Sequence, residues 1–112
     1  MIEKTILDYM AAQLAPVPVY MEVPVNPPET FVVIQKTGGG LTNWIYSSAF
    51  AIQSYAGSLY GASQLNESVR AAMLGIVELD DIASVRLNSE YNFTDTATKH
   101  YRYQGVYDVV HY

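Results

Sequence analysis

The C-terminal segment constrains the fold of this chain most, because apolar and polar residues alternate along it for more than ten positions. From Lys99 onward, Tyr101, Tyr103, Tyr107 and Val109 alternate with His100, Arg102, Gln104 and Asp108. A period of two is the pattern of a β-strand with one buried face. The segment therefore predicts a terminal strand longer than the usual length of about five or six residues, with aromatic side chains on one face.

Two other segments have the period of an α-helix. Between Ile2 and Leu14, apolar residues recur at steps of three and four, Glu3 lies in the first turn, and Pro16 follows the end. The second segment has Ser58 as a candidate N-cap, and its apolar stripe contains Leu59, Ala62, Leu65, Val69, Met73 and Ile76. We expect helices over residues 2–14 and from about Ser58 to Val77.

The first half of the chain also contains three candidate strands. Prolines surround Val17–Val23, which predicts an edge or irregular strand there. Thr30–Lys36 is apolar on both faces at residues 31–34, as in a central strand. The third strand begins at Trp44, with Trp44, Tyr46, Phe50 and Ile52 on one face and Ser47, Ala49, Ala51 and Gln53 on the other. The small residues of that second face leave room for a helix or a neighbouring chain.

Between the second and third strands, Gly38–Asn43 predicts a flexible connection, since three successive glycines maximise backbone freedom. We expect this connection to move freely in the monomer and to become ordered on assembly. A further strand is predicted over Ile82–Leu87. The resulting order is α-β-β-β-α-β-β, and a chain of 112 residues is limited to one domain. We therefore expect a single α+β domain over residues 1–112, a mainly antiparallel sheet with two helices on one face.

Composition excludes several classes of function. The formal charge of -5 disfavours specific binding to nucleic acid, because phosphates attract basic surfaces. Cysteine is absent, so the chain has no disulfide framework, thiolate metal site or cysteine nucleophile. No stretch reaches the length of about 18 apolar residues that a membrane span needs, and the N-terminus lacks the pattern of a signal peptide. We expect a soluble protein that is cytosolic when made.

The candidate chemical motifs are weak. Gly38–Gly40 is followed by Leu41 and Thr42 instead of the lysine and hydroxyl of a phosphate-binding loop. His100 and His111 are the only imidazoles, and they fall on opposite faces of the terminal strand, so they cannot share a metal. One enzymatic alternative pairs His100 with a carboxylate, either Asp80 or Asp81. We expect no catalytic residue, no cofactor and no metal site.

Tyrosine is unusually frequent, with ten residues in 112. Its ring offers a large contact area and its hydroxyl a polar tip, and so tyrosine is enriched at protein interfaces. Ten such rings are hard to bury in one small domain. We expect several of them at a subunit contact.

Four parts of the chain carry a resemblance to known proteins: Tyr20–Pro24, Phe31–Ile34, Phe50–Ala56, and Tyr91–Thr96 with Tyr101–Gln104. They resemble small tail-completion or tail-terminator-like proteins of long-tailed bacteriophages and prophages, and the similarity covers essentially the whole chain. The resemblance implies a structural virion protein without catalytic residues. Such a protein forms a ring, commonly a homohexamer, that ends the tail tube at the head and joins it to neck or connector proteins. It is made in the bacterial cytoplasm and then resides in the virion tail or neck.

Two further readings of the resemblance and composition remain. Head-completion or connector proteins are similarly small, and a monomeric adaptor binds one protein partner through a sheet edge. The residues that we predict to contact a second subunit or a partner are Gly38, Gly39, Gly40, Leu41, Tyr46, Tyr55, Tyr101 and Tyr103.

Overall fold

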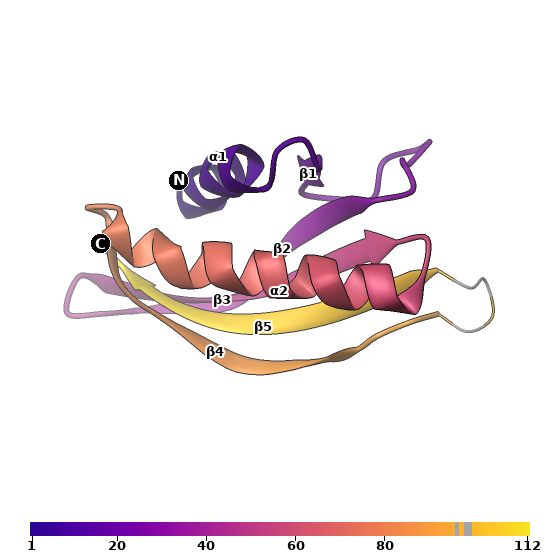
Figure 1. Cartoon of the computed structure of the whole chain (residues 1–112). Helices are drawn as coiled ribbons and strands as arrows, with labels where there is room; N and C mark the ends of the chain where they lie inside the picture. The colour runs from indigo at the N-terminus through magenta and orange to yellow at the C-terminus, as the bar shows by residue number, and fades with distance from the viewer. Residues whose placement is uncertain (96, 98–99) are drawn as a thin grey trace.

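The computed structural model describes residues 1–95, 97 and 100–112 and contains one five-stranded sheet with two helices on one face (Figure 1). The strand order is β1-β2-β3-β5-β4, with β1 and β2 parallel and the other neighbours antiparallel. The elements are α1 (Ile2–Leu14), β1 (Val19–Tyr20), β2 (Phe31–Thr42), β3 (Ile45–Ala56), α2 (Leu59–Gly75), a 3-10 turn (Ile76–Glu78), β4 (Ile82–Asn92) and β5 (Tyr101–His111). This arrangement confirms the predicted α+β class and its order of elements.

Both helices form where the apolar period predicted them. The α1 helix has the predicted bounds and buries Ile6, Met10 and Leu14. The α2 helix is capped by Ser58, whose hydroxyl accepts a hydrogen bond of 3.0 Å from the backbone N–H of Gly61. Such a cap satisfies one of the unpaired N–H groups of the first turn. The regular helix ends at Gly75, and the predicted last residues form the 3-10 turn instead.

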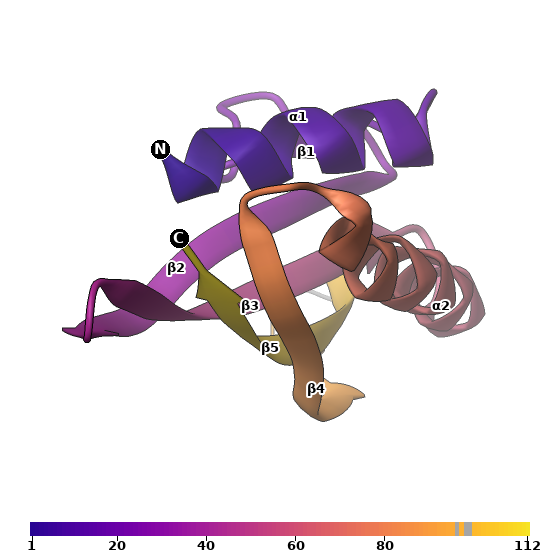
Figure 2. The same ribbon diagram turned by 90° about the vertical axis from the view of Figure 1, so that its left-hand side faces the viewer.

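The main core lies between the helices and the sheet, with α1 over β1 and β2 and α2 over β3, β5 and β4 (Figure 2). Phe50 and Tyr107 are the largest side chains that are fully buried there. Gly105 makes room for Tyr107, because a Cβ at this glycine would lie 2.8 Å from the tyrosine ring. Burial raises the pKa of Tyr107 to about 12. The long terminal strand therefore carries its aromatic face into the core.

The opposite face of the sheet carries a smaller cluster. Phe31, Val33 and Tyr55 are buried there, and Tyr20 packs against them. All four residues from Phe31 to Ile34 are thus buried, which confirms a central strand that is apolar on both faces. Farther along this face, Gln53 donates a hydrogen bond of 2.9 Å to the Gln104 side chain.

Several predicted boundaries were wrong. Within the predicted Val17–Val23 strand only two residues pair, at the edge of the sheet beside β2. The β4 strand runs to Asn92, five residues beyond the predicted end. The predicted start of the terminal strand, Lys99, lies outside the described residues, and β5 begins at Tyr101. The predicted connection Gly38–Asn43 differs most from the structure, because β2 continues through it to Thr42.

Candidate interaction surface

The predicted flexible connection is instead part of a long hairpin. Gly38, Gly39 and Gly40 pair with β3 in the ladder, and β2 continues to Thr42. A β-bulge at Thr37 separates this stretch from the first half of β2. The backbone hydrogen bonds of the ladder order the glycines, and no side-chain contact is needed. Because this ordering does not depend on side chains, the pattern of side chains in the sequence does not reveal it.

The turn of the hairpin consists of two residues, Asn43 and Trp44, since Thr42 pairs directly with Ile45. Asn43 has φ 51° and Trp44 has φ 67°, so both have left-handed backbone conformations. This conformation is the one that tight two-residue hairpins require, and Asn-Gly is their usual sequence. For tryptophan the conformation costs about 1–2 kcal/mol. Trp44 therefore lies in the turn and not, as predicted, within the third strand.

Exposed apolar side chains gather at this end of the hairpin, residues 36–46, which we call the arm. Trp44 is 86% exposed, and Leu41, Ile45 and Tyr46 are each at least 40% exposed. Figures 1 and 2 show the tip of the arm projecting past the end of β5. Large apolar groups gathered on one surface are typical of an interaction site.

Two glycines of the arm are not required by the folded monomer. A Cβ at Gly38 or Gly40 would have no atom within 4 Å, whereas one at Gly39 would meet Lys36 and the Ser47 carbonyl oxygen. None of the seven glycines, all of which lie in the described part of the chain, has a positive φ. A glycine weakens the strand that contains it. Glycine in a strand often marks a place where another backbone approaches closely. Gly38 and Gly40 thus leave an open strip on the face of the arm.

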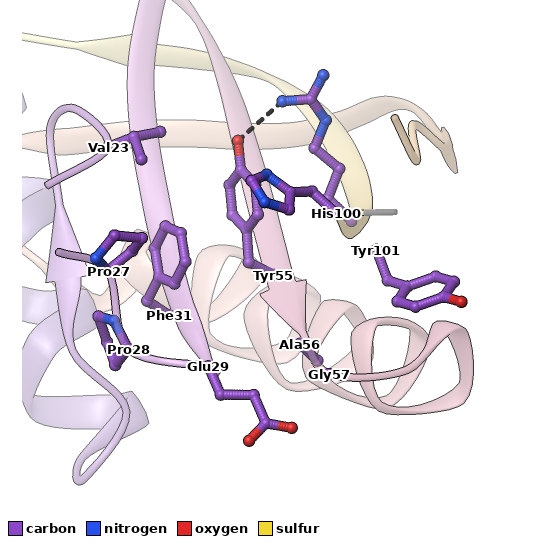
Figure 3. A pocket seen from close by; sticks show the side chains of 11 residues that line it. Val23, Pro27, Pro28, Glu29, Phe31, Tyr55, Ala56, Gly57, His100 and Tyr101 are labelled. Carbon is purple, nitrogen blue, oxygen red and sulfur yellow. Dashed lines mark hydrogen bonds between the residues drawn. The ribbon is translucent and has the colours of Figure 1, made fainter. Parts of the chain in front are cut away.

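A cavity of about 440 Å³ lies at the other end of the same hairpin (Figure 3). Its floor is formed by Phe31 and Tyr55, whose rings stack with 4.3 Å between centroids and 6° between planes. Pro27 and Pro28 form one wall, from the loop that precedes β2. We call this space the end cavity.

Arg102 also lines the end cavity and is held by two hydrogen bonds and a ring contact. Its Nη1 donates a hydrogen bond of 2.8 Å to the Tyr55 hydroxyl, and its Nε donates one of 2.7 Å to the Phe93 carbonyl oxygen. The guanidinium carbon lies 4.4 Å from the centroid of the Phe93 ring. Among the described residues, no carboxylate forms an ion pair with Arg102. The end cavity therefore combines stacked rings with a fixed cation.

The structure divides the predicted contact residues between these two ends. Gly38, Gly39, Gly40, Leu41 and Tyr46 all belong to the arm, while Tyr55 and Tyr101 line the end cavity. In Figure 3 the Tyr101 ring points away from Tyr55. Tyr103 is half-buried, pairs with Ser54 and Asn92, and belongs to neither group.

Sequence reasoning did not assign Trp44, Arg102, Phe31 or the two prolines to a site. The positive φ of Trp44 and the bonds of Arg102 depend on tertiary geometry, so no local pattern indicates them. The paired prolines were the one visible signal, because Asn26–Glu29 has the composition of an exposed loop beside a strand.

The two histidines lie at opposite ends of β5. His100 lines the end cavity, whereas His111 is buried beneath Tyr46, with their rings stacked 5.3 Å apart. The Nε2 of His111 lies 2.8 Å from the Ser48 hydroxyl, and burial lowers the pKa of this imidazole. Asp81 lines a second cavity, of about 350 Å³, together with His111 and not with His100. The structure therefore does not bring His100 together with Asp81, one of the two carboxylates that the enzymatic alternative would pair with it.

The Ser48–His111 contact has the separation of a nucleophile and its base, but both side chains are at least 94% buried. Within the described part of the chain, no three histidine, aspartate or glutamate side chains are grouped to hold a metal ion. Neither described helix has the length and apolarity needed to cross a membrane. The arm and the end cavity are consequently the main candidates for a functional surface.

No protein-family model matches the chain, and no curated protein matches it. Functional assignment therefore depends on the geometry of these two surfaces and on the resemblance described above.

Proposed function

We propose that the chain is a structural subunit that assembles with copies of itself into a ring, and that the ring ends a bacteriophage tail beside the head. The observation that carries the proposal is the arm. Its turn has a tryptophan where glycine would be unstrained, and its Gly38 and Gly40 are open on one side, two choices of residue that folding of the monomer does not explain. Backbone strain at an exposed residue points to a role outside the monomer.

The size of the domain is compatible with a ring. Each subunit of a ring contributes two different patches, and an average interface covers about 800 Å² on each partner. Two such patches would take about a quarter of the accessible surface of 6377 Å². The charge of -5 also suits a ring through which DNA passes, because an acidic lumen repels DNA.

The assignment to a phage tail depends on the resemblance to tail-completion and tail-terminator-like proteins. By that resemblance the ring would stop growth of the tail tube and offer a docking face to neck or connector proteins. Genes for head, neck and major tail proteins beside the gene for this chain would support the assignment. A metabolic operon would contradict it.

The assembly step can be tested with purified protein. We expect the wild-type mass in solution to correspond to a closed ring, visible by electron microscopy. The double variant Gly38→Val/Gly40→Val fills the open strip of the arm, so it should remain folded and become monomeric. Ser89→Val places the same side chain at an exposed position of β4 and serves as a control. Wild-type protein that stays monomeric at every concentration would contradict the proposal.

A second candidate function is that of a monomeric adaptor, and the outer edge of β2 favours it. Only Val32 and Val33 of β2 pair with β1, so in the described chain the remaining edge up to Thr42 has no strand beside it. An open edge can accept a strand from a partner protein. A wild-type monomer that binds a neck or tube protein through this edge would favour the adaptor over the ring.

A further inference from the structure

We propose that Trp44 at the tip of one arm inserts into the end cavity of a second copy of the chain. This inference depends on the proposed self-assembly and specifies the contact that produces it. The two surfaces differ in kind, one projecting and one concave, as a head-to-tail contact between identical subunits requires. Each subunit would give its tip to one neighbour and receive the tip of the other.

A subunit cannot place Trp44 in its own end cavity. Phe31 forms the floor of the cavity at the start of β2, and Thr42 precedes the turn at the end of the same strand. Eleven steps of about 3.3 Å separate these residues by about 36 Å along a paired strand. The whole molecule is 44 Å long, so the tip and the cavity lie near its opposite ends. Only another copy can bring the two surfaces together.

The chemistry of the end cavity fits an indole ring. Its volume of about 440 Å³ is within the usual range of small-ligand sites, and its floor is the stacked Phe31–Tyr55 pair. The guanidinium of Arg102 lies on its wall without a carboxylate partner in the described chain, and a cation of this kind attracts the face of a tryptophan ring. Glu29 also lines the cavity, with its carboxylate directed away from the Phe31 and Tyr55 rings in Figure 3.

Charge favours the same pairing. The arm contains one charged residue, Lys36, and therefore carries a formal charge of +1. The rest of the chain carries -5 minus +1, or -6. A basic arm is attracted to the acidic second copy as a whole, and the two charged residues that line the end cavity, Glu29 and Arg102, cancel each other, so the cavity does not oppose the approach. Tryptophan, tyrosine and arginine are also the residues that most often dominate the binding energy of protein interfaces.

Variants of exposed residues test the contact without disturbing the core. Val23 lines the end cavity and is 51% exposed, so Val23→Lys places a charge where the indole would lie. Val25 is 95% exposed and does not line the cavity, and Val25→Lys is therefore a control with the same charge. Trp44→Gly removes the tip and has the turn residue that the positive φ favours. Circular dichroism verifies that each variant is folded.

We expect Val23→Lys and Trp44→Gly each to self-associate roughly 30-fold or more weakly than wild type, the scale of losing a tryptophan hot spot. Val25→Lys should assemble as wild type does. The decisive sample is an equimolar mixture of Val23→Lys, which retains the tip, and Trp44→Gly, which retains the cavity. Together they have one intact contact, so the mixture should form a heterodimer that does not grow further.

Fluorescence provides a second readout, because Trp44 is the only tryptophan in the chain. Its emission should shift to shorter wavelength when wild-type protein assembles, and the shift should be absent in Val23→Lys. Folded Val23→Lys that assembles with the wild-type shift would overturn the inference but leave the proposed ring intact. A mixture that remains monomeric would also overturn it. Wild-type protein without any self-association would overturn the proposed function itself.

Discussion

The two halves of β2 share one backbone ladder but differ in what surrounds their side chains. Phe31–Ile34 is buried on both faces of the sheet, whereas every residue from Gln35 to Thr42 is exposed. The first half belongs to the core, and its side chains determine the register of the sheet. The second half is ordered by backbone pairing with β3, and apart from the hydrogen bonds of Gln35 with Gln53 and of Thr37 with the Ala49 carbonyl oxygen, its exposed side chains can contact another molecule. The same strand thus begins as a structural element and ends as an interaction surface.

Truncation of apolar side chains should affect the free energy of unfolding very differently in the buried part of the hairpin and in the exposed arm. This is the largest of the expected effects. Phe50 of β3 is fully buried, so Phe50→Ala should lower the free energy of unfolding by about 3–5 kcal/mol. Leu41 is 49% exposed, and Leu41→Ala should change the free energy of unfolding of the monomer by less than about 0.5 kcal/mol. Urea unfolding measures both values. Equal losses would show that the arm packs against its own subunit.

Glycine substitutions should have opposite signs in the two parts of the sheet. Gly105→Ala places a methyl group against the buried Tyr107 ring and should destabilise the monomer by about 1–3 kcal/mol. Gly40→Ala meets no atom and has no positive φ, so it should stabilise the monomer by about 0.4–1 kcal/mol through the unfolded state. Thermal unfolding of dilute protein compares the two. A loss of stability in Gly40→Ala would contradict an open strip on the arm.

A smaller effect on stability is expected from pH. Its source is His111, which lies where the buried part of the sheet meets the arm and is stacked on Tyr46. Burial lowers the pKa of His111 in the folded protein, so below a pH of about 6.5 the unfolded chain binds this proton more readily. Stability should therefore be highest above that pH and fall as the pH drops toward the folded pKa. In His111→Asn the decrease in stability that comes from protonation of His111 at low pH should be absent. An unchanged pH profile would exclude His111 as its source.

The sequence predicted the parts of the fold in which side chains specify the structure. The apolar steps of α1, the buried run of Phe31–Ile34 and the alternation of β5 all indicated their elements. The arm was missed because backbone hydrogen bonds to β3 order Gly38–Gly40, and a run of glycines has no side-chain period to reveal this.

The candidate site was predicted only in part for a related reason. Five of its eight proposed residues lie in the arm, but no single segment contains the end cavity. The cavity forms where the loop before β2, the end of β3 and the start of β5 meet. Arg102 becomes a fixed cation only through its bonds to Tyr55 and Phe93, which are distant from each other in the chain.

We infer that Trp44 serves assembly at some expense to the stability of the monomer. The most direct test is the melting temperature of wild type and Trp44→Gly over a wide range of protein concentration, because self-association makes this temperature concentration-dependent. In dilute samples Trp44→Gly should melt a few degrees higher, since glycine relieves a strain of about 1–2 kcal/mol. With rising concentration the wild-type melting temperature should increase and exceed that of Trp44→Gly, which should begin to rise only at concentrations roughly 30-fold higher or more. Two curves that rise in parallel, or a variant that melts lower when dilute, would contradict the account.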